Sequence, residues 1–356
     1  MNMEPVRFGV IGCGLMGREF ASVSMRWLHL ACELPRPVIV AACDLSPKNL
    51  DWFRQVPDTK YFYSDYHELL ANPEVEAVYC AVPHHLHAQV YGDVIRAGKH
   101  LIGEKPFGMD LAACEEVEAA MAGRPEVFVR CASEFPFYPA VQQMVKWYRE
   151  GAFGQIIEAR FAIKHSSDMD LAKPINWKRM RAANGEYGCM GDLGIHTQHL
   201  PFRLGFSPRT VSAQLANIAK TRPDENGVPV PCETWDNAIL MCEAQNTAGD
   251  TFPMQLEMKR MAPAAPTPWS MKFTVSTCRP GSPPTIPTPS IIHRPLAVNR
   301  HGRGWSSARK RCIPLSPALF LNSAFPIPCC KCSRRSSASC AAFPAPSAAS
   351  PRPRRI

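Results

Sequence analysis

A glycine-rich segment carries the first chemical signal in the sequence. Gly12-Cys13-Gly14-Leu15-Met16-Gly17 matches G-x-G-x-x-G, and it stands between an apolar strand pattern at 6–11 and a helical pattern that begins at Leu15. Glycines permit a tight turn and close approach of the backbone to a pyrophosphate, and the free N–H groups of a helix N-terminus favour phosphate. The segment therefore predicts a dinucleotide site that includes Gly12, Cys13, Gly14, Leu15 and Met16.

Asp44 ends the next apolar run, at 38–43, and bears on the choice of cofactor. A carboxylate at this position accepts hydrogen bonds from both ribose hydroxyls and repels a 2′-phosphate. Because no Arg follows at position 45, NAD is the expected cofactor, and Lys48 leaves NADP open as the alternative.

Asp192 and His196 are four residues apart in a segment whose pattern predicts a helix from about 191 to 204. Positions i and i+4 share one face of a helix, so both side chains can point into one cleft. Imidazole titrates near neutral pH, and a carboxylate beside it fixes its tautomer and raises its basicity. The pair predicts a general base, although a helix-capping Asp and a core His would have the same spacing.

The elements that must position these residues change character near residue 131. Up to that point strand patterns alternate with helical ones, which implies crossover connections and a parallel sheet. Beyond it strand patterns dominate, which fits an open, mostly antiparallel sheet. The expected fold is a Rossmann domain of the α/β class at 1–132, followed by an α+β substrate domain at 133–280. The predicted strands are 6–11, 38–43, 76–82, 100–103, 127–131, 155–164, 210–218, 234–242, 251–259 and 270–276, and the predicted helices are 15–31, 85–96, 110–121, 138–150 and 191–204.

Two further segments resemble the glucose–fructose oxidoreductase/inositol dehydrogenase (Gfo/Idh/MocA) family. They are Val82-Pro83-His84-His85-Leu86-His87 and Ala97-Gly98-Lys99-His100-Leu101-Ile102-Gly103-Glu104-Lys105-Pro106. In that family the lysine lies between the nicotinamide and the substrate hydroxyl, and the proline is often cis. The resemblance implies these roles for Lys105 and Pro106, and it implies cofactor contacts for Pro83, His87 and Glu104.

The second half of the chain extends the resemblance. Residues 150–156 are similar to the family's helix-to-sheet turn, and 188–196 to its Gly-rich segment with Asp-x-x-x-His. The resemblance implies that His196 takes the proton of a substrate hydroxyl while hydride leaves the same carbon, and that Lys105 holds this hydroxyl. His199 stands where the family has Asp, and Pro201 is expected to disturb the helix.

Trp177 and Arg179, which precede this predicted helix in the sequence, are candidate substrate contacts. Trp177 and Arg179 belong to a polar, basic segment that could line a pocket, and a solvated loop is the alternative. The histidines at 84, 85 and 87 have no carboxylate near them in the sequence, so no metal site is expected.

Charge and composition separate the last part of the chain from the rest. Residues 281–356 contain 12 Lys and Arg, 13 Pro and 12 Ser, with no acidic residue, whereas residues 1–280 carry 28 basic and 31 acidic side chains, a formal charge of −3. The first 280 residues are therefore no candidate for nucleic-acid binding. The tail cannot bury enough apolar surface to fold, and its abrupt onset predicts a shifted reading frame and an incomplete second domain. A basic arm for nucleic acid or anionic lipid is the alternative.

The expected protein is cytoplasmic, since no run of about 20 apolar residues and no signal-peptide pattern occurs. Ten cysteines before residue 281 are spread singly, which predicts free, buried thiols. The expected function is transfer of a hydride between NAD(P) and a secondary alcohol of a sugar, polyol or inositol-like substrate, in a homo-oligomer if the C-terminus were intact. A redox-assisted glycosidase and a dinucleotide-sensing regulator are the alternatives.

Overall fold

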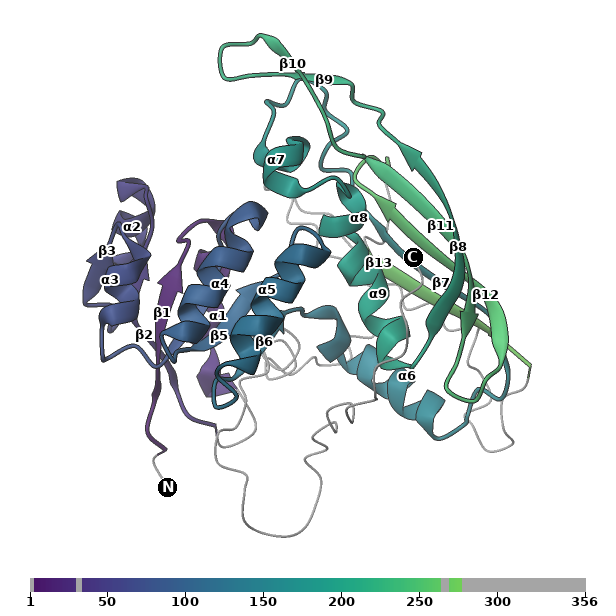
Figure 1. Ribbon diagram of the computed structural model, residues 1–356, viewed down its shortest axis with the longest axis horizontal. Coiled ribbons are helices and arrows are strands. Elements are labelled where there is room, and N and C mark those ends of the chain that lie inside the picture. The colour runs from purple at the N-terminus through teal and green to yellow at the C-terminus, as the bar shows by residue number, and fades with distance from the viewer. Residues whose placement is uncertain (1–2, 30–33, 264–268, 277–356) are drawn as a thin grey trace, which may run out of the picture. The chain divides into compact units, whose positions relative to one another are not determined.

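The computed structural model describes residues 3–29, 34–263 and 269–276, and its elements are labelled in Figure 1. Two sheets organise these residues, a parallel one and a mixed one. The predicted tail at 281–356 lies outside the described residues, and so does the shifted reading frame inferred for it.

The first sheet has six parallel strands in the order β3-β2-β1-β4-β5-β6. This is the strand order of a Rossmann fold, and the order reverses between β1 and β4. In such sheets, ligands bind beyond the carboxyl ends of the strands at this reversal. The strands are β1 (Val6–Ile11), β2 (Pro37–Cys43), β3 (Tyr61–Tyr63), β4 (Ala77–Cys80), β5 (His100–Glu104) and β6 (Val129–Ala132).

Helices connect these strands, and the sequence did not predict all of these elements. The helices are α1 (Leu15–Ser24), α2 (Pro47–Phe53), α3 (Tyr66–Ala71), α4 (His87–Arg96) and α5 (Leu111–Ala122), with short 3₁₀ segments at Trp27–His29 and His84–Leu86. The predicted strands and the helices α1, α4 and α5 are present, although α1 ends at Ser24, well before residue 31. The elements α2, β3 and α3 were not predicted, because three to seven residues give too few positions to reveal a period.

The parallel sheet is buried on both faces, as sheets of this class are. Successive residues of β4 show this, because Val78 and Cys80 pack in one apolar cluster while Ala77 and Tyr79 pack in another. The cysteines of the described ranges are free, as predicted, and six of the eight are buried.

The second sheet has the order β13-β7-β12-β11-β8. Its neighbours are antiparallel except β7 and β12, which run parallel, so the expected open and mostly antiparallel sheet is confirmed. Buried Leu240 alternates with exposed Met241 on β11, which shows that one face of the sheet covers the core. The strands are β7 (Ile156–Lys164), β8 (Ser207–Ala216), β11 (Asn237–Gln245), β12 (Thr251–Lys259) and β13 (Trp269–Val275), and β9 (Thr221–Pro223) pairs separately with β10 (Pro229–Pro231).

The helices of this second part pack on the buried face or lie close to its strand ends (Figure 1). They are α6 (Pro139–Arg149), α7 (Arg181–Asn184), α8 (Cys189–Asp192) and α9 (Gly194–Arg203), with 3₁₀ segments at Phe135–Phe137 and Trp177–Arg179. The single helix predicted at 191–204 is thus two helices that meet at Leu193. Every helix in the described ranges is too short or too polar to cross a membrane.

The expectation that Pro201 disturbs the helix is wrong. Pro201 lies buried inside α9, and the helix continues to Arg203. Backbone bonds still close its last turn, because the Leu204 N–H donates to the Leu200 carbonyl over 3.0 Å and the Phe206 N–H to the Pro201 carbonyl over 2.8 Å.

Candidate active site

The turn between β1 and α1 has the backbone that the glycine motif predicts. Gly12 has a φ of 91°, and a Cβ on it would lie 2.5 Å from the Ala81 carbonyl oxygen. A Cβ on Gly17 would lie 2.3 Å from the Gly12 carbonyl oxygen. Side chains are excluded at both positions, so the turn packs directly against neighbouring backbone.

Gly14 lies on the open side of this turn. It is the N-cap of α1, and no side chain caps the helix there. No heavy atom lies within 4 Å of a Cβ placed on Gly14, and the Leu15 side chain is 75% exposed. The first N–H groups of α1 therefore lie beside an open space that suits a pyrophosphate.

Asp44 is fixed against the same turn. Its Oδ2 accepts hydrogen bonds from the Cys13 N–H at 2.8 Å and from Asn49 Nδ2 at 3.2 Å, and its Oδ1 accepts one from the Ser46 N–H at 2.7 Å. Each carboxylate oxygen can accept more than one bond, so capacity is left for ribose hydroxyls. The structure thus brings the predicted residues 12–16 and Asp44 together, and their arrangement fits a dinucleotide.

The Glu104-Lys105-Pro106 segment leaves the carboxyl end of β5. The Lys105–Pro106 peptide bond is cis, as the resemblance implies. The Glu104 carboxylate is buried, accepts a 2.7 Å hydrogen bond from the Tyr79 hydroxyl, and accepts a second from the Lys105 N–H at 3.2 Å. Burial raises the pKa of Glu104. Its carboxylate supports the strand end, and these contacts give no support to the predicted cofactor contact.

Lys105 reaches Asp192, which is 87 residues away in the sequence. Its Nζ donates to Asp192 Oδ1 over 2.7 Å and to the Asp192 carbonyl oxygen over 3.1 Å. This contact joins the end of a strand in the parallel sheet to the end of α8. Two of the three predicted catalytic residues therefore touch.

Two cations that were not among the predicted site residues complete the surroundings of Asp192. Lys178 Nζ lies 3.2 Å from Oδ2, and Arg260 Nη2 donates to the same oxygen over 2.5 Å. Burial would raise the pKa of Asp192, but Lys105, Arg260 and Lys178 hold it well below its usual range. Lys178 stood in the basic segment that the sequence singled out, whereas Arg260 follows β12 without any motif.

His196 lies in the first turn of α9, and its expected partnership with Asp192 is not formed as predicted. The break at Leu193 separates the two residues into different helices. His196 Nδ1 is buried without a hydrogen-bond partner, so Asp192 does not fix the tautomer through that atom. Burial, and then Lys105, lower the pKa of His196 well below its usual value. The ring is therefore neutral near pH 7, the form that can accept a proton.

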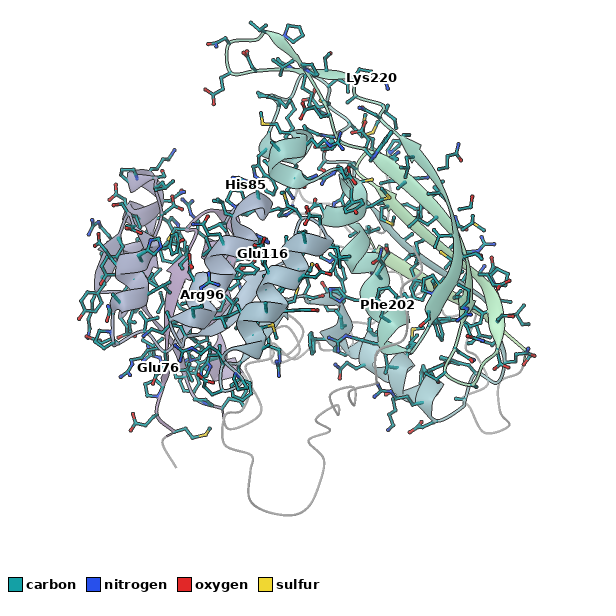
Figure 2. The ribbon with its side chains drawn as sticks, viewed as in Figure 1. Glu76, His85, Arg96, Glu116, Phe202 and Lys220 are labelled. Atoms are coloured by element: carbon teal, nitrogen blue, oxygen red, sulfur yellow. The ribbon has the colours of Figure 1, made fainter. Side chains whose placement is uncertain are left out.

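The loop after β4 contributes one buried histidine to this cluster. Pro83 precedes the 3₁₀ turn at His84–Leu86, and His84 Nε2 lies 3.9 Å from Asp192 Oδ1. Burial lowers the pKa of His84 to about 3. His85 is exposed and is labelled in Figure 2. His84 lies in this cluster, and the only sequence signal that could have found it is the proline–histidine loop.

His87, predicted to lie near the nicotinamide, binds protein atoms at both ring nitrogens. Nδ1 lies 2.6 Å from the Pro106 carbonyl oxygen, and Nε2 lies 2.9 Å from the Val82 carbonyl oxygen. The ring is fully buried. His87 therefore ties the loop after β4 to the cis peptide after β5, which positions Lys105 indirectly.

The two candidate substrate contacts differ in their surroundings. The Trp177 ring lies edge-on to His84, with ring centroids 4.6 Å apart, so it borders the cluster around Asp192. Arg179 is fully buried, where its guanidinium binds Asp168 over 2.5 Å and also binds Asp236. The expectation that Arg179 meets substrate is therefore wrong, because both ends of its guanidinium are occupied inside the protein.

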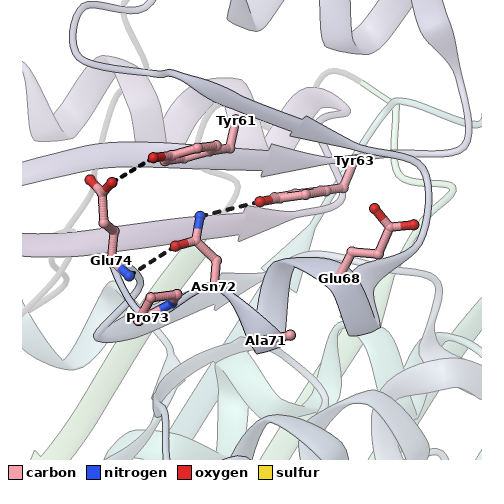
Figure 3. A pocket seen from close by; sticks show the side chains of 7 residues that line it. All are labelled: Tyr61, Tyr63, Glu68, Ala71, Asn72, Pro73 and Glu74. Atoms are coloured by element: carbon pink, nitrogen blue, oxygen red, sulfur yellow. Dashed lines mark hydrogen bonds between the residues drawn. The ribbon is translucent and has the colours of Figure 1, made fainter.

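A separate pocket of about 370 Å³ lies beside the edge strand β3 (Figure 3). Tyr61 donates to Glu74 over 2.5 Å, and Asn72 donates to the Tyr63 hydroxyl over 3.2 Å. Its lining shares no residue with the glycine-rich turn or with the cluster around Asp192. The predicted site residues therefore lie elsewhere.

Comparison with known protein families accounts for both sheets. Residues 6–130 match the family model described as "Oxidoreductase family, NAD-binding Rossmann fold", and residues 141–269 match the GFO/IDH/MocA C-terminal domain. A relative in Danio rerio, trans-1,2-dihydrobenzene-1,2-diol dehydrogenase, is 30% identical over 270 residues, which cover 68% of this chain and 79% of that protein. The chain belongs to the Gfo/Idh/MocA oxidoreductase family.

Other relatives are matched over a smaller share of their length. Levoglucosan dehydrogenase of Pseudarthrobacter phenanthrenivorans is 26% identical over 230 residues, covering 63% of this chain and 57% of that enzyme. An oxidoreductase of Synechocystis, sll0816, is 32% identical over 208 residues, covering 58% of this chain and 54% of the relative. The chain thus spans little more than half the length of these two relatives.

Solved structures of dehydrogenases share the fold. The structure titled "Levoglucosan dehydrogenase, complex with NADH" aligns with a TM-score of 0.70 and 23% identity, covering 77% of this chain and 72% of that one. At this identity the likeness establishes the fold alone.

Proposed function

We propose that this protein is a nicotinamide-dependent oxidoreductase that transfers hydride between NAD(P) and a secondary alcohol of a sugar, polyol or inositol-like substrate. The observation that carries the proposal is the bond from Lys105, at the carboxyl edge of the parallel sheet, to Asp192. It joins a cation and a carboxylate at the edge where such sheets bind ligands, and the neutral His196 lies near the charge of Lys105.

The cofactor half of the proposal rests on the turn after β1. Residues 12–16 would hold the pyrophosphate, and Asp44 would accept the ribose hydroxyls and disfavour a 2′-phosphate. Bound there, the cofactor would supply a nicotinamide ring that accepts or returns hydride.

The protein's own residues manage the proton. Lys105 would hold the substrate hydroxyl and stabilise negative charge on its oxygen, while His196 accepts the hydroxyl proton. The C–H bond gives up its electron pair as hydride as the carbonyl double bond forms. The products are a ketone, the reduced cofactor and one proton on His196.

The names of the relatives support an alcohol or a sugar as the substrate. One is named levoglucosan dehydrogenase, another trans-1,2-dihydrobenzene-1,2-diol dehydrogenase, and one solved structure is titled as a complex with NADH and L-sorbose. Each name refers to an alcohol or a sugar. An alcohol of this kind is therefore the substrate that we propose here.

The test is spectrophotometric assay of NAD⁺ and NADP⁺ reduction with a panel of sugars and polyols. Lys105→Ala should lose turnover while calorimetry still detects NAD binding, and Lys220→Ala, an exposed lysine labelled in Figure 2, should behave as the wild type. Tight NAD binding without any turnover of the panel would favour a dinucleotide sensor. Substrate cleavage without release of NADH would favour the redox-assisted glycosidase.

A further inference from the structure

Two lysines meet at one carboxylate in the candidate site. Lys105 Nζ lies 2.7 Å from Asp192 Oδ1, and Lys178 Nζ lies 3.4 Å from the same oxygen. The two ammonium nitrogens are therefore no more than about 6 Å apart. A ligand with two neighbouring oxygens can meet both cations at once.

Lys178 is the more open of these cations. Its side chain is 36% exposed, compared with 16% for Lys105 and 6% for Arg260. An ammonium group has three N–H donors, so Lys178 can keep Asp192 as a partner and still donate to a ligand. This role is distinct from that of Arg260, which is buried against the same carboxylate.

The backbone around Lys178 is held from several sides. Its carbonyl oxygen accepts a 3.0 Å hydrogen bond from Thr234 Oγ1. The guanidinium of the next residue, Arg179, binds both Asp168 and Asp236. The centroid of the Trp177 ring lies 5.4 Å from Lys178 Nζ. A cation held this way loses little conformational freedom when it binds a ligand.

Carboxyl groups offset part of the positive charge around the cluster. Lys105, Lys178 and Arg260 all contact the Asp192 carboxylate, and the carboxyl groups of Glu104 and Glu134 lie near Lys105. Burial raises the pKa of both glutamates, and the nearby charge of Lys105 opposes this rise.

Unpartnered polar atoms point to a ligand rich in hydroxyl groups. In the described part of the chain, His84 Nδ1 and Arg260 Nε are buried without hydrogen-bond partners, and both residues lie against Asp192. A hydroxyl both donates and accepts, so it suits a site that contains donors, a carboxylate and neutral imidazoles.

We propose that Lys178 binds the hydroxyl on the carbon next to the reacting carbinol, and so makes this enzyme prefer a vicinal diol to an isolated secondary alcohol. Lys105 holds the reacting hydroxyl, and Lys178 holds the neighbouring hydroxyl beside the same Asp192 carboxylate. Lys178 is thus a specificity-determining residue. This inference rests on the proposed function.

The test combines enzyme variants with substrate analogues. The best substrate of the polyol panel is oxidised by wild type, and NMR of the product identifies the reacting carbon. The analogue lacks the hydroxyl on the adjacent carbon. Wild type should lose roughly 10-fold to 100-fold in kcat/KM on the analogue, as expected for a hydrogen bond to a charged group. Lys178→Met should lose about that factor on the diol and show almost no further loss on the analogue.

Two further variants separate recognition from folding. Lys178→Arg should restore part of the preference for the diol, and Lys220→Met should retain all of it. An equal penalty for the analogue in wild type and Lys178→Met would overturn the inference while leaving the dehydrogenase intact. Preference for a 2-hydroxy acid over the diol would overturn it as well. Failure of the proposed function is recognised differently, because wild type would then reduce no NAD⁺ or NADP⁺ with any polyol.

Discussion

The Cys13 amide donates a hydrogen bond to Asp44 Oδ2 over 2.8 Å and so joins the turn after β1 to the end of β2. The second oxygen of Asp44 accepts from the Ser46 N–H over 2.7 Å. Asp44 therefore shapes the glycine-rich turn, and in the proposed function it also presents negative charge to the ribose.

Asp44→Ala should weaken NAD binding roughly 10-fold to 100-fold, because hydrogen bonds to a charged group are lost. Discrimination against NADP should fall at the same time, because the carboxylate that repels a 2′-phosphate is gone. Calorimetric titration with both cofactors measures the two effects. Asp51→Ala, in the exposed part of α2, is the control. An unchanged ratio of NAD to NADP affinity would remove Asp44 from the ribose site.

His196→Asn should reduce kcat by roughly 10²-fold to 10⁴-fold, the usual scale for loss of a general base. NAD affinity should stay the same, since His196 is not among the proposed cofactor contacts. Steady-state assay and calorimetry separate the two quantities. Near-normal turnover in this variant would assign the base to another residue.

The pH profile follows from the burial of the same imidazole. Burial and the charge of Lys105 lower the pKa of His196 well below its usual value, so the ring binds its proton only in more acid solution than an ordinary histidine does. The kcat/KM of wild type should therefore be level from about pH 6 to 8, and fall only in more acid solution. A rise centred between pH 6 and 7 would show a base with an ordinary histidine pKa.

Asp236→Ala should destabilise the fold by about 3–5 kcal/mol, because it leaves the fully buried Arg179 with one of its two carboxylate partners. Arg181→Ala is a matched control on the same segment. Its ion pair with Glu186 is exposed, so its loss should change the unfolding free energy by less than about 1 kcal/mol. Urea unfolding monitored by fluorescence measures both. Equal effects of the two substitutions would mean that the buried pair contributes no more than the exposed one.

Local patterns in the sequence predicted the elements that are long or have special turn residues. Gly12 and Gly17 leave no room for a side chain, so their spacing reveals the turn. By contrast, the short strand β3 and the break at Leu193 follow from packing between distant segments, which a local pattern does not encode.

The same distinction holds for the candidate site. Lys105, Asp192 and His196 stand in motifs, but the contact between Lys105 and Asp192 was not predicted. Arg260 binds Asp192, which is 68 residues away, and Arg179 binds Asp236, which is 57 residues away. A local spacing pattern does not predict contacts between residues so far apart in the chain. The sequence predicts a pocket position for Arg179 because the basic composition of its segment does not distinguish a polar loop from a buried ion pair.

The last prediction concerns acid stability and the neighbouring residues His84 and His85. Burial lowers the pKa of His84 in the folded protein to about 3, whereas the unfolded chain has an ordinary value near 6.5. The unfolded state therefore binds one more proton between these two values. The stability that neutral His84 permits is fully present above pH 6.5, and it is lost progressively as the pH falls toward 3. Each such proton changes the unfolding free energy by about 1.4 kcal/mol per pH unit.

His84→Gln should consequently flatten the pH dependence of the unfolding free energy by about this slope between pH 4 and 6. His85→Gln is the matched control, since His85 is exposed and adjacent in the chain. It should leave the slope as in wild type. Urea unfolding at half-unit steps of pH gives the unfolding free energy of each variant. The slopes against pH are compared, because a substitution can also shift the unfolding free energy by a constant amount. If both variants gave the wild-type slope, His84 would not be held neutral in the fold, and its packing between Trp177 and Asp192 would need another explanation.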